Sequence, residues 1–381
     1  MKFLFWSAAG LIAYAYFGYG AWLWILKRFG RRPIRRAPQY PKVSLLMVVR
    51  NEQDVIERKL NNLEQLDYPP EMMEYVMVSD GSSDHTNQIL NHWSADVRFK
   101  LIFLPESAGK ANGLNQGMRA ATGEIVVLTD ARQHIEGKAV RLLVENFADE
   151  QVGCASGELV LGDPDSGESI AGMGLYWRME KWLRDLESQT GSVIGATGAL
   201  YAIRRDLFCS IPDAAILDDV YLPMCVARQG KRVVFDGRAR AWDQPNLGAQ
   251  REFGRKVRTL SGNYQLLHLA PWLLSTANRL RFRFISHKLS RLIVPFALAA
   301  IFVASVFLHE PVYRIAFILQ VLFYALSVLG LARISPRPVA RLADAAATLV
   351  LLNTAAVVAF TKFITRRQVA WGGHDRVVRT A

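Results

Sequence analysis

The chain has 381 residues, of which 51% are apolar, and it carries a formal net charge of +12. This length accommodates a large domain and a second unit, and the apolar residues concentrate at the two ends, which argues against a purely soluble protein. Basic residues crowd the flanks of apolar segments rather than a recognition helix, so membrane lipids explain the charge better than nucleic acid, which we exclude as a partner. The cysteines lack metal-ligand spacing and are predicted to be free thiols; they are Cys154, Cys209 and Cys225.

Residues 1–26 are predicted to form a transmembrane anchor. The stretch from Phe3 to Leu26 carries no charge and is long enough to cross a bilayer, too long for a cleaved signal peptide. Six basic residues follow between Lys27 and Arg36. Such a cluster marks a cytoplasmic flank, so we expect the N-terminus outside and the next domain in the cytoplasm. Residues 27–42, which include three prolines, form a basic linker.

Between residues 43 and 148, short apolar runs alternate with segments of helical periodicity. Four runs are predicted strands: Val43–Val49, Tyr75–Ser79, Phe99–Leu104 and Ile125–Thr129. The alternation predicts an α/β fold with a mostly parallel sheet and helices on both faces. We assign residues 43–265 to this domain.

The strand at Ile125–Thr129 ends abruptly at Asp130, with Arg132 two residues further on. Ligands of open α/β sheets lie beyond the carboxyl ends of the strands. A carboxylate there can hold a metal or a sugar hydroxyl, and a guanidinium can hold a phosphate. The alternative is an ordinary polar turn.

Two adjacent acids, Asp218 and Asp219, stand at the start of a predicted helix that runs to about Arg228. They can be simple helix caps, or they can supply the carboxylate that takes a proton from a hydroxyl. Further on, Arg255 and Arg258 are three residues apart on a probable helix and share one face. That face is either solvated or grips a diphosphate.

The last third of the chain is predicted to contact the membrane. Residues 266–291 read as an amphipathic interface helix, and residues 292–361 hold three apolar segments, followed by a basic tail at 362–381. The arginine-rich link at 333–341 should be cytoplasmic. Counting crossings then puts the basic tail outside, which conflicts with the positive-inside rule. Either one apolar segment is re-entrant, or this chain is an exception to the rule. The mixed aromatic and basic stretch at 174–187 either lies on the membrane surface or packs on the domain.

Six motifs occur in a specific order: Val48–Glu52, Ser79–Asp84, Gly109–Asn115, Leu128–Gln133, Gly195–Arg204 and Leu217–Asp219. Their order over roughly Val43–Asn263 resembles membrane-bound family-2 glycosyltransferases. The chain is similar to the branch that includes cellulose, hyaluronan and chitin-oligosaccharide synthases and bacterial exopolysaccharide enzymes. The resemblance implies a GT-A fold, a nucleotide-diphosphate sugar donor and an inverting single displacement.

The resemblance also implies roles for individual residues. Asp219 matches the catalytic base, and Asp130 matches the first acid of an Asp-x-Asp pair that holds a divalent Mg or Mn ion. The remaining donor-binding residues would be Glu52, Asp80, Lys110, Arg132, Arg255 and Arg258. The acceptor-binding residues would be Gly195, Thr197, Gly198 and Asp218.

Two departures from the family pattern bear on metal use and processivity. Arg132 occupies the position of the second acid, so one expected metal ligand is missing. Relatives that extend chains processively carry Gln-x-x-Arg-Trp after the base, whereas Gln250–Arg255 has no tryptophan in place.

We therefore predict an enzyme that adds a sugar to a lipid-linked or growing glycan at the cytoplasmic membrane face, in cell-surface polysaccharide synthesis. Transfer to a polyprenyl phosphate is the first alternative. A catalytically degenerate scaffold that works with other polysaccharide-assembly proteins is the second. A dehydrogenase is excluded because no glycine fingerprint follows Val43–Val49.

Overall fold

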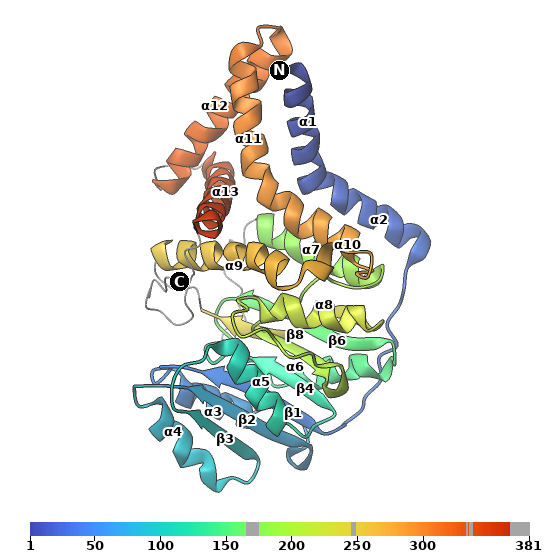
Figure 1. Ribbon diagram of the computed structural model, residues 1–381, viewed down its shortest axis with the longest axis vertical. Helices are drawn as coiled ribbons and strands as arrows, with labels where there is room; N and C mark the ends of the chain where they lie inside the picture. The colour runs from blue at the N-terminus through green and yellow to red at the C-terminus, as the bar shows by residue number, and fades with distance from the viewer. Residues whose placement is uncertain (165–174, 245–248, 333, 335–337, 366–381) are drawn as a thin grey trace.

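The computed structural model describes residues 1–164, 175–244, 249–332, 334 and 338–365. Figure 1 shows two parts along the long axis, with a sheet domain at one end and long helices at the other. Helices α7 (Leu175–Gln189) and α9 (Ala249–Leu269) lie between the two parts. Most functional residues predicted from the sequence lie in the sheet domain, and Arg255 and Arg258 lie on α9 at the boundary between the two parts.

The described residues form one eight-stranded sheet in the order β3-β2-β1-β4-β7-β6-β8-β5. The strands are β1 (Val43–Val49), β2 (Met73–Asp80), β3 (Phe99–Leu104), β4 (Ile125–Thr129), β5 (His134–Ile135), β6 (Val152–Leu161), β7 (Leu200–Arg204) and β8 (Arg232–Asp243). The four strands predicted from apolar runs are therefore confirmed, with β2 longer at both ends. β1, β2 and β4 are buried along their whole length because helices cover both faces of the sheet there, whereas β3 lies at the edge of the sheet and is partly exposed.

The sheet is mostly parallel, as predicted, but β7 is reversed in its middle and β5 pairs antiparallel with β8 at one edge. β1 pairs in parallel with both β2 and β4, and β2 pairs in parallel with β3. β7 runs antiparallel between β4 and β6. The reversal was not evident from the sequence, because an apolar run does not encode its direction relative to its neighbours.

Helices cover both faces of the sheet. One face packs against α3 (Ile56–Glu64) and α6 (Ala139–Glu145), and the other packs against α5 (Lys110–Ala120) and α8 (Asp218–Arg228). α4 (Thr86–His92) lies beside β3 at the edge. Short 3-10 turns complete this part: η2 (Pro70–Met72), η3 (Trp93–Ala95), η4 (Asn146–Ala148) and η5 (Arg205–Leu207).

The N-terminal helix is continuous through α1 (Lys2–Ala13), the π-helical turn η1 (Tyr14–Gly18) and α2 (Tyr19–Gly30). Its second half packs on α7, where Tyr19 and Leu23 meet Leu183 and Leu186. α7 in turn contacts β8. The mixed aromatic and basic stretch at 174–187 was expected either to lie on the membrane surface or to pack on the domain. The structure shows packing on the protein, with α2 on one side of α7 and β8 on the other.

Residues 266–291 hold a break rather than one helix. α9 ends at Leu269, and the short η6 (Pro271–Leu274) follows. Pro271 has no N–H and its ring opposes the preceding turn, which ends the helix. The chain then enters α10 (Arg281–Phe284), the π-helical η7 (Ile285–Leu289) and α11 (Ser290–Phe307) as one helical run.

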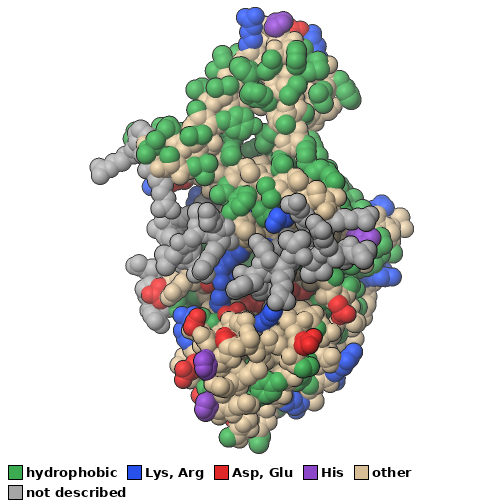
Figure 2. All heavy atoms as spheres, turned by 60° about the vertical axis from the view of Figure 1, so that its left-hand side comes forward, with side chains coloured by type: hydrophobic (Ala, Val, Ile, Leu, Met, Phe, Trp, Pro, Cys, Tyr) green, Lys and Arg blue, Asp and Glu red, His purple; other side chains and the backbone are tan. Residues whose placement is uncertain are grey.

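Within the described residues, four helical runs are long and apolar enough to cross a membrane: Lys2–Gly30, Arg281–Phe307, Pro311–Leu331 (α12) and Ala340–Ile364 (α13). Figure 2 shows hydrophobic side chains gathered over this end of the molecule, whereas charged side chains dot the sheet domain. Figure 1 shows α13 nearly end-on, while α1 and α11 run along the long axis. α13 is therefore steeply inclined to both.

Close packing of α5 on the sheet gives a stability prediction. A Cβ atom at Gly113 would lie 2.6 Å from Cγ1 and 3.0 Å from Cγ2 of Val48. Because a β-branched side chain in a strand has little rotameric freedom, we expect Gly113→Ala to cost about 1–3 kcal/mol of unfolding free energy from overpacking, offset in part by the better helix propensity of alanine.

The check is the thermal unfolding midpoint of both variants in the same detergent. Gly254→Ala on α9 is the matched control, because a Cβ atom there meets nothing within 4 Å. An equal or higher midpoint for Gly113→Ala would show that β1 and α5 pack less tightly than described.

Candidate functional site

Lys110 joins three elements at the carboxyl edge of the sheet. It is the first residue of α5, after Gly109, whose φ of +92° lies in the region that glycine adopts without strain. Its Nζ lies 2.9 Å from Asp130 Oδ1, beyond β4, and 3.4 Å from Asp218 Oδ1 on α8. Burial alone would lower the pKa of Lys110, but the two carboxylates outweigh it and raise that pKa, so the ammonium stays charged.

Asp80 organises the loop that leads into Lys110. It is fully buried, and its carboxylate accepts hydrogen bonds from Ser107 Oγ (2.7 Å), Ala108 N (2.7 Å) and Gly109 N (3.0 Å). A carboxylate with both oxygens occupied in this way fixes the backbone of the loop. In this structure Asp80 contributes to the site by holding that loop.

The two acids at the start of α8 differ in exposure. Asp218 is buried and accepts a hydrogen bond from the Tyr201 hydroxyl at 3.2 Å. Asp219 is half-buried, and burial together with the nearby charge of Asp218 raises the pKa of Asp219 to about 6, against the opposing charge of Lys110. A carboxylate poised near neutral pH suits general-base work.

The Gly195–Thr197–Gly198 segment lies against Asp219. The Ala196 N–H donates to the backbone oxygen of Asp219 at 2.7 Å. A Cβ atom at Gly198 would lie 3.1 Å from Asp219 Oδ2, and one at Gly195 would lie 3.3 Å from Val220. We call residues 195–198 the floor segment. Glycine at positions 195 and 198 allows this segment to lie close to Asp219, the candidate base.

Arginines complete the cationic side of the site. Arg258 on α9 lies within electrostatic reach of Asp218, Asp130 and Asp219, whose charges oppose the lowering of its pKa by burial. Arg255 is half-buried three residues earlier on the same helix. Residues 249–252 belong to α9, but their side chains, including that of Gln250, lie outside the described part of the chain.

Glu52 and Arg132 are neighbours of Asp130. Burial raises the pKa of Glu52, the charge of Arg132 opposes this shift, and Asp130 adds to it. The structure thus gathers Glu52, Lys110, Asp130, Arg132, Asp218, Asp219 and Arg258 in one region. Among the residues that the structure describes, no group of three or more His, Cys, Asp or Glu side chains could hold a metal ion.

Lys59, which no sequence motif singled out, lies under the loop that carries Asp130 and Arg132. Its Nζ donates to the Gln133 carbonyl oxygen at 2.7 Å and to Thr129 Oγ1 at 3.2 Å. Burial lowers the pKa of Lys59 to about 7. A signal was present, because Lys59 is three residues from Ile56 and four from Leu63, on the buried face of α3.

Arg184 on α7 is a second residue that no sequence motif singled out. Its Nη1 donates to Thr197 Oγ1 at 2.6 Å, and the Thr197 N–H donates to Ser156 Oγ at 2.9 Å. Arg184 lies in an ordinary mixture of basic and aromatic residues in the sequence. Only the packing of α7 against β8 brings Arg184 to Thr197.

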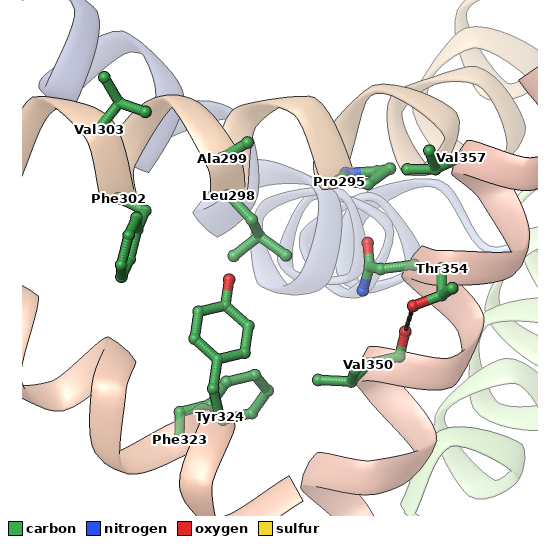
Figure 3. A pocket seen from close by; sticks show the side chains of 11 residues that line it. Pro295, Leu298, Ala299, Phe302, Val303, Phe323, Tyr324, Val350, Thr354 and Val357 are labelled. Atoms are coloured by element: carbon green, nitrogen blue, oxygen red, sulfur yellow. Dashed lines mark hydrogen bonds between the residues drawn. The ribbon is translucent and has the colours of Figure 1, made fainter. Parts of the chain in front are cut away.

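A separate cavity of about 410 Å³ lies among the long helices (Figure 3). α11, α12 and α13 supply its walls, and Figure 3 shows the Tyr324 hydroxyl pointing into the space between them. Its lining is mainly apolar: Pro295, Leu298, Ala299, Phe302, Val303, Phe323, Tyr324, Val350, Asn353, Thr354 and Val357. It shares no residue with the charged region around Lys110.

The sequence and structure resemble known proteins. Residues 44–211 match the family described as Glycosyl transferase family 2. The chain is 27% identical over 312 residues to the probable glycosyltransferase YdaM of Bacillus subtilis, covering 76% of this chain and 72% of that protein. It is 24% identical over 243 residues to the poly-β-1,6-N-acetyl-D-glucosamine synthase of Staphylococcus aureus, covering 62% of this chain but 58% of the synthase.

The fold is similar to a mannosyltransferase, PcManGT from Pyrobaculum calidifontis, solved in complex with GDP-Man and Mn²⁺. The TM-score is 0.73 with 24% sequence identity, over 96% of this chain and all (100%) of that chain. This likeness confirms the predicted GT-A fold.

Proposed function

This chain is a glycosyltransferase whose residues 44–211 form a family-2 domain, and we propose that it transfers a sugar, with inversion, from a nucleotide-diphosphate donor to a lipid-linked or growing glycan acceptor. In this proposal, the sugar transfer is a step in the synthesis of a cell-surface polysaccharide. The enzyme is integral to the plasma membrane, with the N-terminus outside and the sheet domain in the cytoplasm. Glycan-assembly proteins and membrane lipids are its expected partners.

One observation carries this proposal: a half-buried carboxylate, Asp219, lies in the same charged region as Lys110 and Arg258. Asp219 takes the proton of the acceptor hydroxyl as the oxygen attacks the anomeric carbon. The bond from that carbon to the diphosphate breaks, and cations stabilise the departing charge. A single displacement with one base inverts the anomeric configuration, by the logic of inverting glycosidases.

The donor-side residues divide between direct and supporting roles. Lys110, Arg258, Arg255 and Arg132 would face the diphosphate, because guanidinium and ammonium groups bind phosphate oxygens strongly. Glu52 would support the nucleoside pocket, and Asp80 would act through the 107–109 loop that it holds. Gly195, Thr197, Gly198 and Asp218 would lie beneath the acceptor.

The residues present fit a resident metal poorly. Mg²⁺ is commonly bound by one or two carboxylates plus substrate phosphates, and here Asp130 is the carboxylate that would hold Mg or Mn. Its Oδ1 already lies 2.9 Å from the Lys110 ammonium, and Arg132 stands two residues away in place of a second acid. These cations repel a divalent ion, and no step above passes through one.

The cavity among α11, α12 and α13 favours a second candidate, transfer of one sugar to a polyprenyl phosphate. An apolar space of about 410 Å³ between apolar helices suits part of an isoprenoid chain. A degenerate scaffold remains the alternative from another class. It conflicts with the ordered set of Lys110, Asp130 and Asp219.

The test is a donor-hydrolysis screen of the purified protein across nucleotide sugars, with and without Mn²⁺ or Mg²⁺. Hydrolysis of one donor identifies the sugar and supports the enzyme. Nucleotide-sugar binding without hydrolysis or transfer, under every metal condition and with lipid and glycan acceptors supplied, would support the scaffold instead.

We expect Asp219→Asn to abolish transfer while donor affinity stays within a few fold. Loss of a positioned base typically removes 10² to 10⁴ in rate, whereas the diphosphate contacts reside on other side chains. For the unmodified enzyme, kcat/KM should fall as pH drops through about 6, because protonated Asp219 accepts no further proton.

Turnover, nucleotide binding and the pH profile are measured in parallel. Near-normal turnover of Asp219→Asn would contradict the assignment, and Asp218→Asn would then be the variant to compare.

Arg132→Ala should weaken binding of the nucleoside diphosphate more than that of the monophosphate. A contact from arginine to the terminal phosphate is worth about 1.5–3 kcal/mol. Calorimetric titration of both nucleotides measures the difference, with Arg119→Ala as control because Arg119 is exposed on α5. Equal losses for the two nucleotides would make Arg132 a structural residue of its loop.

The enzyme is expected to release its product after one or a few additions. The segment after the base lacks the tryptophan on which a terminal sugar could rest. Several polar side chains of the membrane helices bond to carbonyl oxygens of their own helix: Ser327 to Tyr324, Thr354 to Val350 and Thr361 to Val357. Asn353 bonds both to Leu349 of its own helix and to the Tyr16 hydroxyl of the N-terminal helix. A passage for a hydrated polymer needs polar groups turned into a cavity.

Product size on a short acceptor, at limiting enzyme, measures this property. A ladder that climbs evenly by single sugars agrees with release after each transfer. Long polymer formed while most acceptor is untouched would contradict it.

A further inference from the structure

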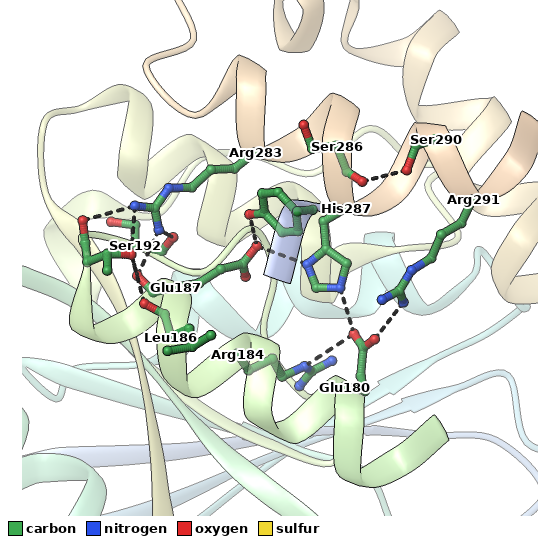
Figure 4. A network of polar contacts seen from close by, with 12 residues as sticks. Glu180, Arg184, Leu186, Glu187, Ser192, Arg283, Ser286, His287, Ser290 and Arg291 are labelled. Carbon is green, nitrogen blue, oxygen red and sulfur yellow. Dashed lines mark hydrogen bonds and ion pairs between the residues drawn. The ribbon is translucent and has the colours of Figure 1, made fainter. Parts of the chain in front are cut away.

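A largely buried cluster of charges connects α7 to the helical run Arg281–Phe307, formed by α10, η7 and α11 (Figure 4). We call this run the membrane helix. We call the cluster of charges the Glu180 cluster; its members are Tyr19, Glu180, Arg184, Glu187, Arg283, His287 and Arg291. Glu187 is fully buried. Its Oε1 accepts a hydrogen bond from the Tyr19 hydroxyl at 2.6 Å and lies 2.9 Å from His287 Nδ1. The N-terminal helix, α7 and η7 thus meet at one carboxylate.

Glu180 is the branch point of this cluster. Its Oε1 lies 3.1 Å from His287 Nε2, and its Oε2 lies 2.6 Å from Arg291 Nη1. His287 and Arg291 are four residues apart, on either side of the boundary between η7 and α11. Both therefore reach from the membrane helix to the same side chain of α7, as Figure 4 shows.

One arm of the cluster continues to the floor beneath the candidate base. Arg184 lies one turn after Glu180, with Nε 3.9 Å from Glu180 Oε1. Its Nη1 donates to Thr197 Oγ1 at 2.6 Å. Thr197 precedes Gly198, where a Cβ atom would lie 3.1 Å from Asp219 Oδ2. The path from the membrane helix to the base is thus His287 and Arg291, Glu180, Arg184, Thr197, then Asp219.

Stability alone does not account for such a cluster. Buried ion pairs often stabilise no better than apolar side chains of the same volume, because desolvation offsets the attraction. What charge-assisted hydrogen bonds add is a fixed geometry. Lys288, beside His287, also lies within electrostatic reach of Glu180, Arg184 and Asp219. The membrane helix therefore brings a positive charge, that of Lys288, within electrostatic reach of Asp219.

We propose that Arg184 is a positioning residue that sets the place of the acceptor floor relative to Asp219, and that the membrane helix fixes Arg184 through Glu180. The inference rests on the proposed function, because it concerns the acceptor in that reaction. It assigns no contact between Arg184 and the reacting atoms. Its consequence is that residues of the membrane helix control acceptor use without entering the site.

The first experiment compares Thr197→Val, Thr197→Ser and Arg184→Gln in the full-length protein. Thr197→Val keeps the shape but removes the hydroxyl, and Thr197→Ser keeps the hydroxyl. We expect Thr197→Val and Arg184→Gln to lower kcat/KM for the acceptor by about 10- to 100-fold, the scale of a small misplacement of a reacting group. Thr197→Ser, which keeps the hydroxyl, should retain more acceptor kcat/KM than Thr197→Val, and donor affinity should change by less than about 3-fold in all three variants.

A double-mutant cycle tests whether the two residues act through their mutual contact. The double variant Arg184→Gln/Thr197→Val should lose no more than either single variant, because both remove the same hydrogen bond. Arg178→Gln is the matched control, since Arg178 is exposed on the same helix. Fully multiplicative losses would overturn the proposal.

The remote arm is tested with Arg291→Gln, whose side chain contacts Glu180 from the membrane helix. Its acceptor kcat/KM should fall in the same sense as that of Arg184→Gln, with donor affinity kept. The thermal midpoint in detergent is measured for every variant, and because Thr197→Val leaves all charges in place, it keeps the test valid if a charge variant fails to fold.

Two failures are distinguishable. If the unmodified enzyme transfers sugar but Thr197→Val and Arg184→Gln match it, or change donor affinity as much as acceptor use, the positioning role is wrong and the proposed function stands. If the unmodified protein neither hydrolyses nor transfers any donor sugar, the proposed function itself fails.

Discussion

The ammonium of Lys110 is the interaction on which the site depends, because it lies between carboxylates from two separate parts of the sheet domain. Asp130 follows β4 and Asp218 begins α8, and Lys110 Nζ lies within 3.4 Å of both. Without this positive charge, the carboxylates of Asp130, Asp218 and Asp219 would repel one another more strongly. The loop held by Asp80 delivers Lys110 to this position.

In the proposed reaction, the same ammonium would connect donor binding to the candidate base Asp219. Burial and the charge of Asp218 raise the pKa of Asp219, and Lys110 opposes them. A donor diphosphate would compete with the carboxylates for Lys110, so its arrival and departure would change the field at Asp219. Arg258, within reach of the same acids, can take over part of that compensation. In the proposed reaction, sharing cations between these acids and the donor phosphates would give a role to the many charges of both signs in the site.

The sequence was sufficient where the determining interactions are local. The apolar run of β1, the glycine before Lys110 and the paired acids at the start of α8 each form a short pattern with a direct physical meaning. Because parallel strands end at one edge, residues that follow them converge there. That rule is enough to predict Asp130 at the candidate site from the sequence.

Long-range packing determined what the sequence did not reveal. The antiparallel β7 depends on its partners rather than on its own residues. Arg184 meets Thr197 of the floor segment because α7 packs against β8, a relation that no spacing encodes. Lys59 is the intermediate case: its place on the buried face of α3 was readable, but its carbonyl partner at Gln133, 74 residues away, was not.

The inclination of α13 bears on the conflict between the crossing count and the positive-inside rule. α13 packs along α9, with Phe360 and Phe363 against Tyr264 at ring-centroid distances of 5.7 and 5.4 Å. It is steeply inclined to α1 and α11 (Figure 1). A helix in this orientation fits a path along the membrane surface, beside α9, as well as a path across the bilayer. The surface path keeps Lys362 on the same side as the arginine-rich link at 333–341, which the positive-inside rule favours and a fourth crossing would violate.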